Sequence, residues 1–183
     1  LCQEVDGIFL IQNPTSRYLE EKEMDKIASY PYQRDLHPYH AKDGKVKALE
    51  TIKFSIMTHH GCWGECNYCA IAAHQGRTIR TRSEQNILSE AKHFTTLKDF
   101  KGIISDVGGP TANMYGYECK KKMNLGTCID NKRCVDAHRL CRTMKVDHSR
   151  NIKLLKDIRA IPKVKKAFIA SGIRYDFIAA DKN

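Results

Sequence analysis

Three cysteines share one short segment, in the run Cys62-Trp-Gly-Glu-Cys66-Asn-Tyr-Cys69. The run directly follows a strand-like stretch, so any fold of this chain must gather the three thiols where that strand ends. Thiolates are the usual protein ligands of iron–sulfur clusters, and three of them can hold three corners of a cubic [4Fe–4S] cluster. This spacing supplies no fourth ligand, which leaves one iron open to a small molecule. The run therefore predicts a reactive cluster rather than a purely structural metal site.

Two other interpretations of the cysteines stay open at this point. The three thiols, with His59 or His60, could bind zinc as a tetrahedral Cys3His site, although zinc ligands more often come in pairs separated by a longer loop. The eight cysteines could instead pair as disulfides. The chain shows no secretory signal, however, so free thiols in a reducing cytoplasm are the expectation.

The composition is that of one globular domain. The 183 residues are 42% apolar and 28% charged, which argues against a disordered chain. No apolar stretch approaches the roughly 20 residues of a membrane-spanning helix, so no membrane association is expected. The chain opens at Leu1 without a methionine and stops soon after its last expected strand. We therefore expect it to be a piece of a longer polypeptide.

The charge is strongly basic. The formal net charge is +10, and the densest basic clusters lie at residues 120–122 and 163–166. Such an excess can attract RNA. No run mixes basic with aromatic residues as a base-stacking platform would. A zinc-dependent, nucleic-acid-binding module without catalysis is therefore kept as the alternative to an enzyme.

Residues 1–50 are expected to form an extension made of a strand, a helix and a connector. The apolar run from Gly7 to Gln12 predicts a buried strand. Thr15 or Ser16 can cap a helix that continues to about Ser29. The following segment, residues 30–39, carries two prolines and no helical period, so it predicts an ordered connector.

Residues 51–183 alternate between strand and helix patterns. Strands are expected over residues 51–56, 102–109 and 166–171. One helix is expected after the cap Ser83, with Ile87, Ala91 and Phe94 on one face, and another is expected to open at Ser149, with Ile152, Leu155 and Ile158 along it. This order implies an α/β fold with a parallel sheet, in which chemistry lies on loops at the carboxyl ends of the strands. The cysteine loop and Gly108-Gly109 both occupy such positions, so we expect them to converge.

The cysteine run resembles the C-x3-C-x-φ-C signature of the radical S-adenosylmethionine (radical SAM) superfamily, with Tyr68 at the aromatic position. The segment Gly108-Gly109-Pro110 lies where that family often has Gly-Gly-Glu, with proline in place of the acid. Residues 105–115 and 169–176, with the shorter runs 74–77 and 82–84, are similar to the YgiQ-type radical SAM proteins.

This resemblance implies the first half of a partial (β/α)6 TIM-like barrel, here about three βα units. It implies that Cys62, Cys66 and Cys69 bind a [4Fe–4S] cluster whose open iron chelates S-adenosylmethionine. It places four residues at that cofactor: Tyr68, Gly108, Gly109 and Pro110. The implied activity is reductive cleavage to a 5′-deoxyadenosyl radical. A reductant such as flavodoxin or ferredoxin is the expected partner, and the substrate is unassigned.

Several residues beside these motifs are weaker candidates. His74 and Arg77 follow the cysteine loop, and Arg174 and Asp176 follow the third strand, from which they could reach cofactor or substrate. His59 and His60 are expected to pack at the strand end or to donate to sulfur.

Four more cysteines lie in a polar insertion at about residues 111–148: Cys119, Cys128, Cys134 and Cys141. An insertion this polar can scarcely bury a core of its own, so a metal or a cross-link would help to order it. The four thiols predict an auxiliary zinc or iron–sulfur site, with disulfides or free thiols as alternatives. His138 and His148 could each replace a missing cysteine ligand.

Overall fold

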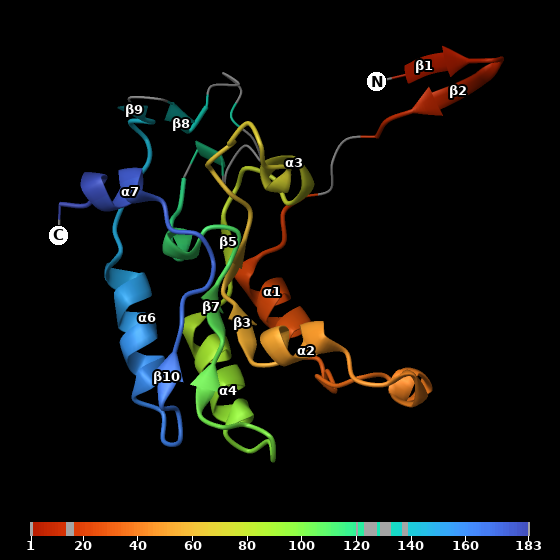
Figure 1. The fold of residues 1–183 in the computed structure, drawn as a ribbon. Coiled ribbons are helices and arrows are strands. Elements are labelled where there is room, and N and C mark those ends of the chain that lie inside the picture. Colours follow the sequence, from red (N-terminus) through yellow and green to blue (C-terminus); the bar gives the residue numbers. More distant parts are fainter. Residues whose placement is uncertain are drawn as a thin grey trace.

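The structure is a computed structural model that describes residues 2–13, 17–119, 121–122, 128, 133–136 and 139–182. Its centre is a short parallel sheet in which the second strand lies between the first and the third (Figure 1). Strand β3 (Ser55–Met57) pairs with β7 (Asp106–Gly108), and β10 (Lys166–Ala167) pairs with β6 (Ile103–Ile104). The expected α/β fold with parallel strands is therefore confirmed. The complete barrel stays a prediction.

Strands β6 and β7 are two halves of one expected strand, interrupted at Ser105. Ser105 N–H donates to the Phe54 carbonyl at 3.0 Å, and Val107 N–H donates to the Phe168 carbonyl at 2.9 Å. These bonds carry the ladder across the interruption on both sides. The carboxyl ends of all three strands consequently lie at one edge of the sheet.

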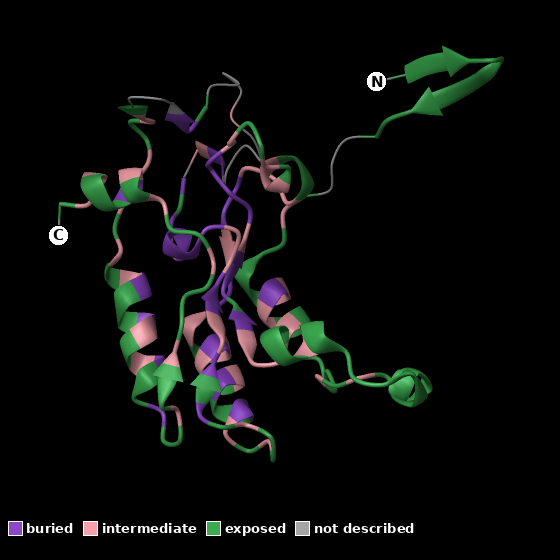
Figure 2. Cartoon of the chain, in the orientation of Figure 1, coloured by how far each residue is buried: buried purple, intermediate pink, exposed green. Residues whose placement is uncertain are grey.

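Two helices cover one face of this sheet. Helix α4 (Glu84–Phe94) begins as expected, because the Ser83 hydroxyl accepts from Asn86 N–H at 3.1 Å. Helix α6 (Ser149–Arg159) lies beside it. The core between helices and strands is a single apolar cluster, seen as the buried centre of Figure 2. Its buried members are Ile56, Ile87, Ala91, Phe94, Ile104, Val107, Tyr115, Leu154, Ile158 and Ile161.

The inward face of α6 matches the expected residues only in part. Ile158 is fully buried and Leu155 packs against the core as expected. The buried residues beside them are Leu154 and Asn151, whereas Ile152 is exposed. The face is set by Leu154 and Ile158, one helical turn apart, and Ile161 continues it past the helix end. Side-chain periodicity alone could not choose between these two neighbouring stripes.

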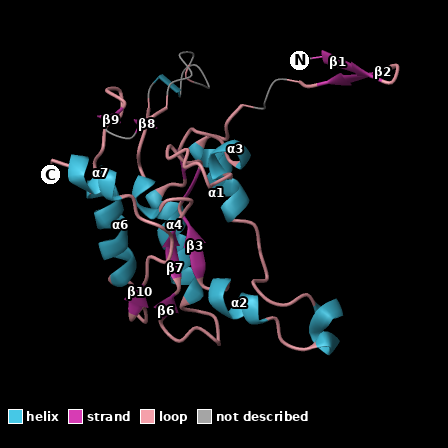
Figure 3. Ribbon diagram, turned by 45° about the horizontal axis from the view of Figure 1, so that its top comes forward, coloured by secondary structure: helices cyan, strands magenta, loops and turns pink. Residues whose placement is uncertain are grey.

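The expected buried strand at residues 7–12 is wrong in its burial. Strands β1 (Cys2–Val5) and β2 (Ile8–Ile11) form an antiparallel hairpin whose residues are all exposed. Asp6 and Gly7 turn it with positive φ angles of 51° and 78°, as a two-residue hairpin turn requires. The hairpin lies apart from the body of the chain in Figures 1 and 3, so no second layer covers either face.

The first helix and the first core strand also begin later than expected. Helix α1 (Glu21–Ala28) starts at a capping box between Glu20 and Glu23, and the expected caps at positions 15 and 16 lie outside the described residues. The connector contains a 3-10 helix, η1 (Pro38–Asp43). Helix α2 (Lys47–Ile52) occupies the start of the expected strand, so Ile52 is exposed and the strand begins at Ser55.

The remaining elements are short and carry the loops above the sheet. They are β4 (His59–His60), α3 (Ile71–His74), β5 (Arg80–Thr81), η2 (Ala112–Met114), β8 (Val135–Asp136), β9 (Arg139–Leu140) and α7 (Tyr175–Ala180). Within the described part of the chain, every helix is too short or too polar to traverse a lipid bilayer.

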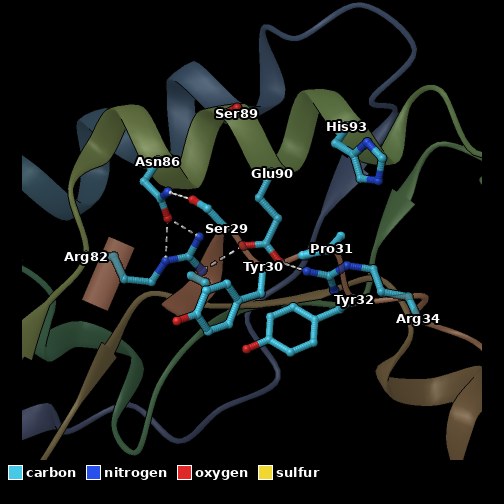
Figure 4. A pocket seen from close by; sticks show the side chains of 11 residues that line it. Ser29, Tyr30, Pro31, Tyr32, Arg34, Arg82, Asn86, Ser89, Glu90 and His93 are labelled. Carbon is cyan, nitrogen blue, oxygen red and sulfur yellow. Dashed lines mark hydrogen bonds and ion pairs between the residues drawn. The ribbon is translucent and has the colours of Figure 1, made fainter. Parts of the chain in front are cut away.

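A buried charge network ties the connector to the sheet at a cavity of about 300 Å³ (Figure 4). The Glu90 carboxylate of α4 lies between Arg34 and Arg82, with 2.6 Å from its Oε2 to Arg82 Nη1. Arg82 also donates to the Met57 carbonyl at 2.8 Å and to Asn86 Oδ1. The side chain of Arg82 is only 4% exposed. Glu90 therefore neutralises a cation that holds the end of β3.

Glu90→Gln should destabilise the protein strongly, because it leaves buried Arg82 without a charged partner. We expect the free energy of unfolding to fall by about 3 kcal/mol, measured by urea denaturation. Glu84→Gln is the matched control, because Glu84 is on the same helix as Glu90 but forms a more exposed ion pair, with Lys153 of α6. Its loss should cost less than about 1 kcal/mol. Equal losses in the two variants would contradict this role.

Candidate functional site

The cysteine loop is held on both sides, by the strand that precedes it and by the segment that follows it. Strand β4 pairs antiparallel with β5, with His59 opposite Thr81 and His60 opposite Arg80. Cys62 N–H donates to the Gly76 carbonyl at 3.1 Å. Gly61 has a φ of +81°, and a Cβ there would lie 2.2 Å from the Thr78 carbonyl oxygen. Only glycine therefore lets the chain turn from β4 into the loop.

The three cysteines of the loop line one cavity of about 160 Å³. Cys62 is buried, and Cys66 and Cys69 are partly exposed. The loop folds over its own sulfurs, because Gly64 N–H donates to Cys62 Sγ at 3.3 Å. A Cβ on Gly64 would lie 3.3 Å from Cys62 Sγ and 3.5 Å from Cys66 Sγ. The loop thus presents the thiols as a group with backbone packed closely behind them.

The same cavity is lined by the exits of the second and third strands. Pro110 and Thr111 follow β7, and Gly172, Ile173 and Arg174 follow β10. The Thr111 hydroxyl lies 3.4 Å from Cys62 Sγ. The cysteine loop and the residues that follow Gly108-Gly109 therefore meet at this cavity, although the two glycines themselves do not line it.

Arg174 reaches the cysteines directly. Its Nη1 donates to Cys66 Sγ at 3.2 Å, while Nε and Nη2 donate to Asp176. Asp176 and, less strongly, Cys66 raise the pKa of the Arg174 guanidinium. Both residues were expected to reach cofactor or substrate from the third strand, and the structure brings Arg174 against a cysteine with Asp176 behind it.

Asn113 holds Arg174 in that position. Its Oδ1 accepts from the Arg174 N–H at 2.9 Å, and its Nδ2 donates to the Arg174 carbonyl at 3.0 Å. Asn113 is buried, so this two-point clamp is sheltered from water. This role of Asn113 was not predicted, because the local sequence pattern does not reveal which backbone groups an asparagine will bond.

Asp106 was also missed as a site residue. It accepts from Ala170 N–H at 2.8 Å, from Ser171 N–H at 3.3 Å and from the Ser171 hydroxyl at 2.6 Å. It thereby ties the exit of β10 to the second strand. An acidic residue within an otherwise apolar strand segment, two positions before a pair of glycines, was the available signal.

Gly108 and Gly109 are required by close packing. A Cβ on Gly108 would lie 2.5 Å from Ser171 Oγ, and one on Gly109 would lie 2.6 Å from His59 Cε1. The Gly108 carbonyl accepts from both the backbone N–H and the hydroxyl of Thr58, at 2.7 and 3.0 Å. These two bonds use its lone pairs, so the carbonyls that could meet a cofactor are those of Gly109 and Pro110. A second cavity, of about 260 Å³, lies over both glycines and shares Pro110 with the first.

His59 packs beneath the Gly-Gly turn. Its Nδ1 lies 2.8 Å from the Thr58 hydroxyl, and burial lowers its pKa from the ordinary 6.5 to about 4. It is therefore neutral at pH 7 and belongs to the strand end rather than to the thiols. Among the described residues, no three His, Cys, Asp or Glu side chains close around a single metal ion.

The other weak candidates are dispersed around the loop. Arg77 pairs with Glu65 of the loop at 2.6 Å, which raises the pKa of its guanidinium. Tyr68 lines the cavity but is 92% exposed, and His74 ends α3 at the surface.

The four insertion cysteines do not line this cavity and are free thiols like the other four. Cys119 and Cys134 are buried with Trp63 and Tyr117 in a second apolar cluster. His148 bonds Tyr117 and Asp181, so it is engaged elsewhere than at a metal. His138 lies outside the described residues. The disulfide alternative is not formed.

Comparison with known proteins gives matches along the chain. A family model described as Radical SAM N-terminal matches residues 1–55. A UPF0313 protein of Fusobacterium nucleatum subsp. nucleatum is 55% identical over 181 residues, which cover 99% of this chain and 32% of that protein. UPF0313 proteins of Clostridium perfringens and Clostridium botulinum are 45% and 47% identical over 183 residues. Those matches cover 100% of this chain and 27% and 28% of the relatives.

This chain belongs with the radical SAM-related UPF0313 proteins. The family predicted from the cysteine motif is thereby confirmed, and the YgiQ-type resemblance is consistent with it. The chain spans about a third or less of the length of these relatives.

The residues of this radical SAM-related chain fit a cluster held by three thiolates. The three thiols are unpaired and line one cavity. Two donors already point at sulfur, from Gly64 N–H and from Arg174, and such hydrogen bonds stabilise the negative charge of metal-bound thiolates. The fit rests on these contacts and not on the family name.

Gly61→Ala should unfold the loop region, because the added Cβ meets a backbone carbonyl that cannot move aside. We expect a loss of about 2–4 kcal/mol in the free energy of unfolding, combining backbone strain with overpacking. The control is Gly7→Ala, which has a similar φ of +78° but nothing within 4 Å, and should cost about 1 kcal/mol or less. Urea denaturation of both variants tests the difference, and a Gly61 variant no worse than the control would refute the clash.

The buried neutral His59 should make the protein acid-sensitive. The unfolded chain takes up the proton near pH 6.5 and the folded chain only near pH 4, so stability falls as pH drops through that window. Unfolding free energies at pH 7 and 4.5 should differ by about 2 kcal/mol more in the wild type than in His59→Asn. An unchanged pH dependence in His59→Asn would show that His59 does not carry this effect.

Proposed function

We propose that this chain carries the cluster-binding and S-adenosylmethionine-binding part of a radical SAM enzyme. The observation that supports it most is the single cavity lined by Cys62, Cys66 and Cys69 together with the exits of β7 and β10. Family membership adds the expectation of an iron–sulfur cluster and S-adenosylmethionine. With both bound, the chemistry supplied is reductive cleavage of the sulfonium C–S bond to give a 5′-deoxyadenosyl radical.

The chain's own residues have distinct roles in this proposal. Cys62, Cys66 and Cys69 hold the cluster as thiolates. Arg174, clamped by Asn113, places a positive charge at Cys66 and so favours the anionic, metal-bound form of that sulfur. The loop covering Cys62 limits access of water to the ligand.

The Gly-Gly exit of β7 supplies the second half of the proposed site. A cavity lies beside Gly108 and Gly109, and the Cβ positions of the two glycines are filled by Ser171 and His59. We assign this space to the methionine end of S-adenosylmethionine, with the carbonyls of Gly109 and Pro110 facing its amino group. Tyr68 at the rim is the remaining proposed contact.

The wider setting is proposed on the same basis. Eight free thiols support a reducing, cytoplasmic environment. The proposed chemistry requires a one-electron reductant, such as flavodoxin or ferredoxin. The residues of this chain do not identify the substrate of such an enzyme.

Cys66→Ala should abolish cluster binding, because it removes one of only three ligands. After anaerobic reconstitution, wild-type protein should hold about four iron and four sulfide and should form 5′-deoxyadenosine from S-adenosylmethionine and dithionite. The variant should retain neither property. Cys2→Ala is the matched control, because Cys2 is an exposed cysteine of the hairpin, and it should behave as wild type.

The same measurement separates the proposal from its rival. A colourless wild-type protein that carries zinc and binds RNA in a salt-sensitive way would support the non-catalytic module instead. Retained cleavage in Cys66→Ala would reject the ligand assignment outright. An electron paramagnetic resonance spectrum recorded with and without S-adenosylmethionine would show whether the cofactor reaches the cluster.

A further inference from the structure

The cysteines of the insertion are arranged across a small hairpin. Strands β8 and β9 pair antiparallel, with Val135 opposite Leu140 and Asp136 opposite Arg139. The next pair outward is Cys134 and Cys141, and Cys141 N–H donates to the Cys134 carbonyl at 2.9 Å. Directly opposed residues carry their side chains on the same face, with Cβ atoms about 5 Å apart. The fold therefore brings two cysteines within reach of one ion.

A third cysteine meets this pair through a shared hydroxyl. Thr143 Oγ1 lies 3.2 Å from Cys141 Sγ and 3.8 Å from Cys119 Sγ. Cys119 is buried and precedes the hairpin by a long stretch of sequence, so tertiary folding alone places it there.

Positive charge surrounds the group. Lys122 is only 3% exposed, and its Nζ donates to the Arg77 carbonyl. The Lys122 side chain also hydrogen-bonds Cys134. Arg77 interacts electrostatically with Cys134 and Cys128, so the fourth cysteine lies near the same cation. A buried lysine beside thiols is costly unless those thiols become anionic.

We propose that Cys119, Cys128, Cys134 and Cys141 bind one structural zinc ion as a four-thiolate site. Zinc in such sites is tetrahedral, with sulfurs about 2.3 Å from the metal. Among the described residues, no three such side chains stand close enough together to hold an ion, so binding requires Cys119 and Cys128 to move onto the hairpin pair. Each thiol releases its proton on binding, and Lys122 and Arg77 offset the resulting negative charge.

A single ion fits better than a second cluster because of the hairpin pair. Two directly opposed cysteines bring their sulfurs together at one point, whereas a cubic cluster spreads its thiolates over separate corners. The polar insertion also gains order that its own composition cannot supply. Through Arg77 and Glu65, the site would brace the cysteine loop from behind.

The test keeps this site separate from the proposed cluster. The full chain is prepared with Cys62, Cys66 and Cys69 all changed to alanine, so that any bound metal must lie elsewhere. We expect one zinc per chain by mass spectrometry, and cobalt substitution should give the intense absorption of a tetrahedral four-thiolate site. Adding Cys134→Ser and Cys141→Ser should remove the zinc, whereas adding Cys2→Ser should not.

A second test uses the wild-type chain, so that its result does not depend on whether the variants fold. Removing zinc from it with a chelator should accelerate proteolysis between residues 119 and 141 several-fold, and zinc should restore protection. The proposal is overturned if the triple variant binds no zinc, if zinc survives the loss of Cys134 and Cys141, or if the insertion carries iron and sulfide. A Cys134–Cys141 disulfide in protein purified under reducing conditions would also overturn it.

Discussion

The functional region depends on the parallel register of three strands. Because β3, β6/β7 and β10 run in the same direction, their carboxyl ends meet at one edge of the sheet, and the loops leaving them must share that edge. The register is secured by apolar packing of Ile56, Ile104 and Val107 against α4 and α6. Without this alignment, the cysteine loop, the Gly-Gly turn and Arg174 would have no reason to meet.

Polar side chains then fasten the three loops to one another. Thr58 bonds the Gly108 carbonyl, Asp106 holds Ser171, and Asn113 clamps Arg174. Each pair joins one strand exit to a neighbouring exit. Buried hydrogen bonds of this kind contribute modestly to stability but fix geometry strongly, since leaving a partner unpaired is costly. The site is therefore a rigid edge on which the thiol-bearing loop is mounted.

Prediction from the sequence succeeded where the signal was local. The α4 cap at Ser83 and its face of Ile87, Ala91 and Phe94 follow from helix periodicity, and the thiol spacing follows from the motif. It failed where tertiary packing decided which element formed or which face was buried. Ile52 lies in a helix rather than in a strand, and Ile152 lies on the exposed face of α6. The apolar run Ile8–Ile11 forms an exposed strand.

The sequence by itself determined the chemistry available: three close thiols, a glycine pair after a strand, and four more cysteines in a polar insertion. Only the tertiary structure decided which groups meet. Arg174 lies 108 positions from Cys66 yet donates to its sulfur, and Thr143 lies 24 positions from Cys119 yet contacts it. Such contacts depend on strand register and loop closure, which are set by the packing of the whole core rather than by neighbours along the chain.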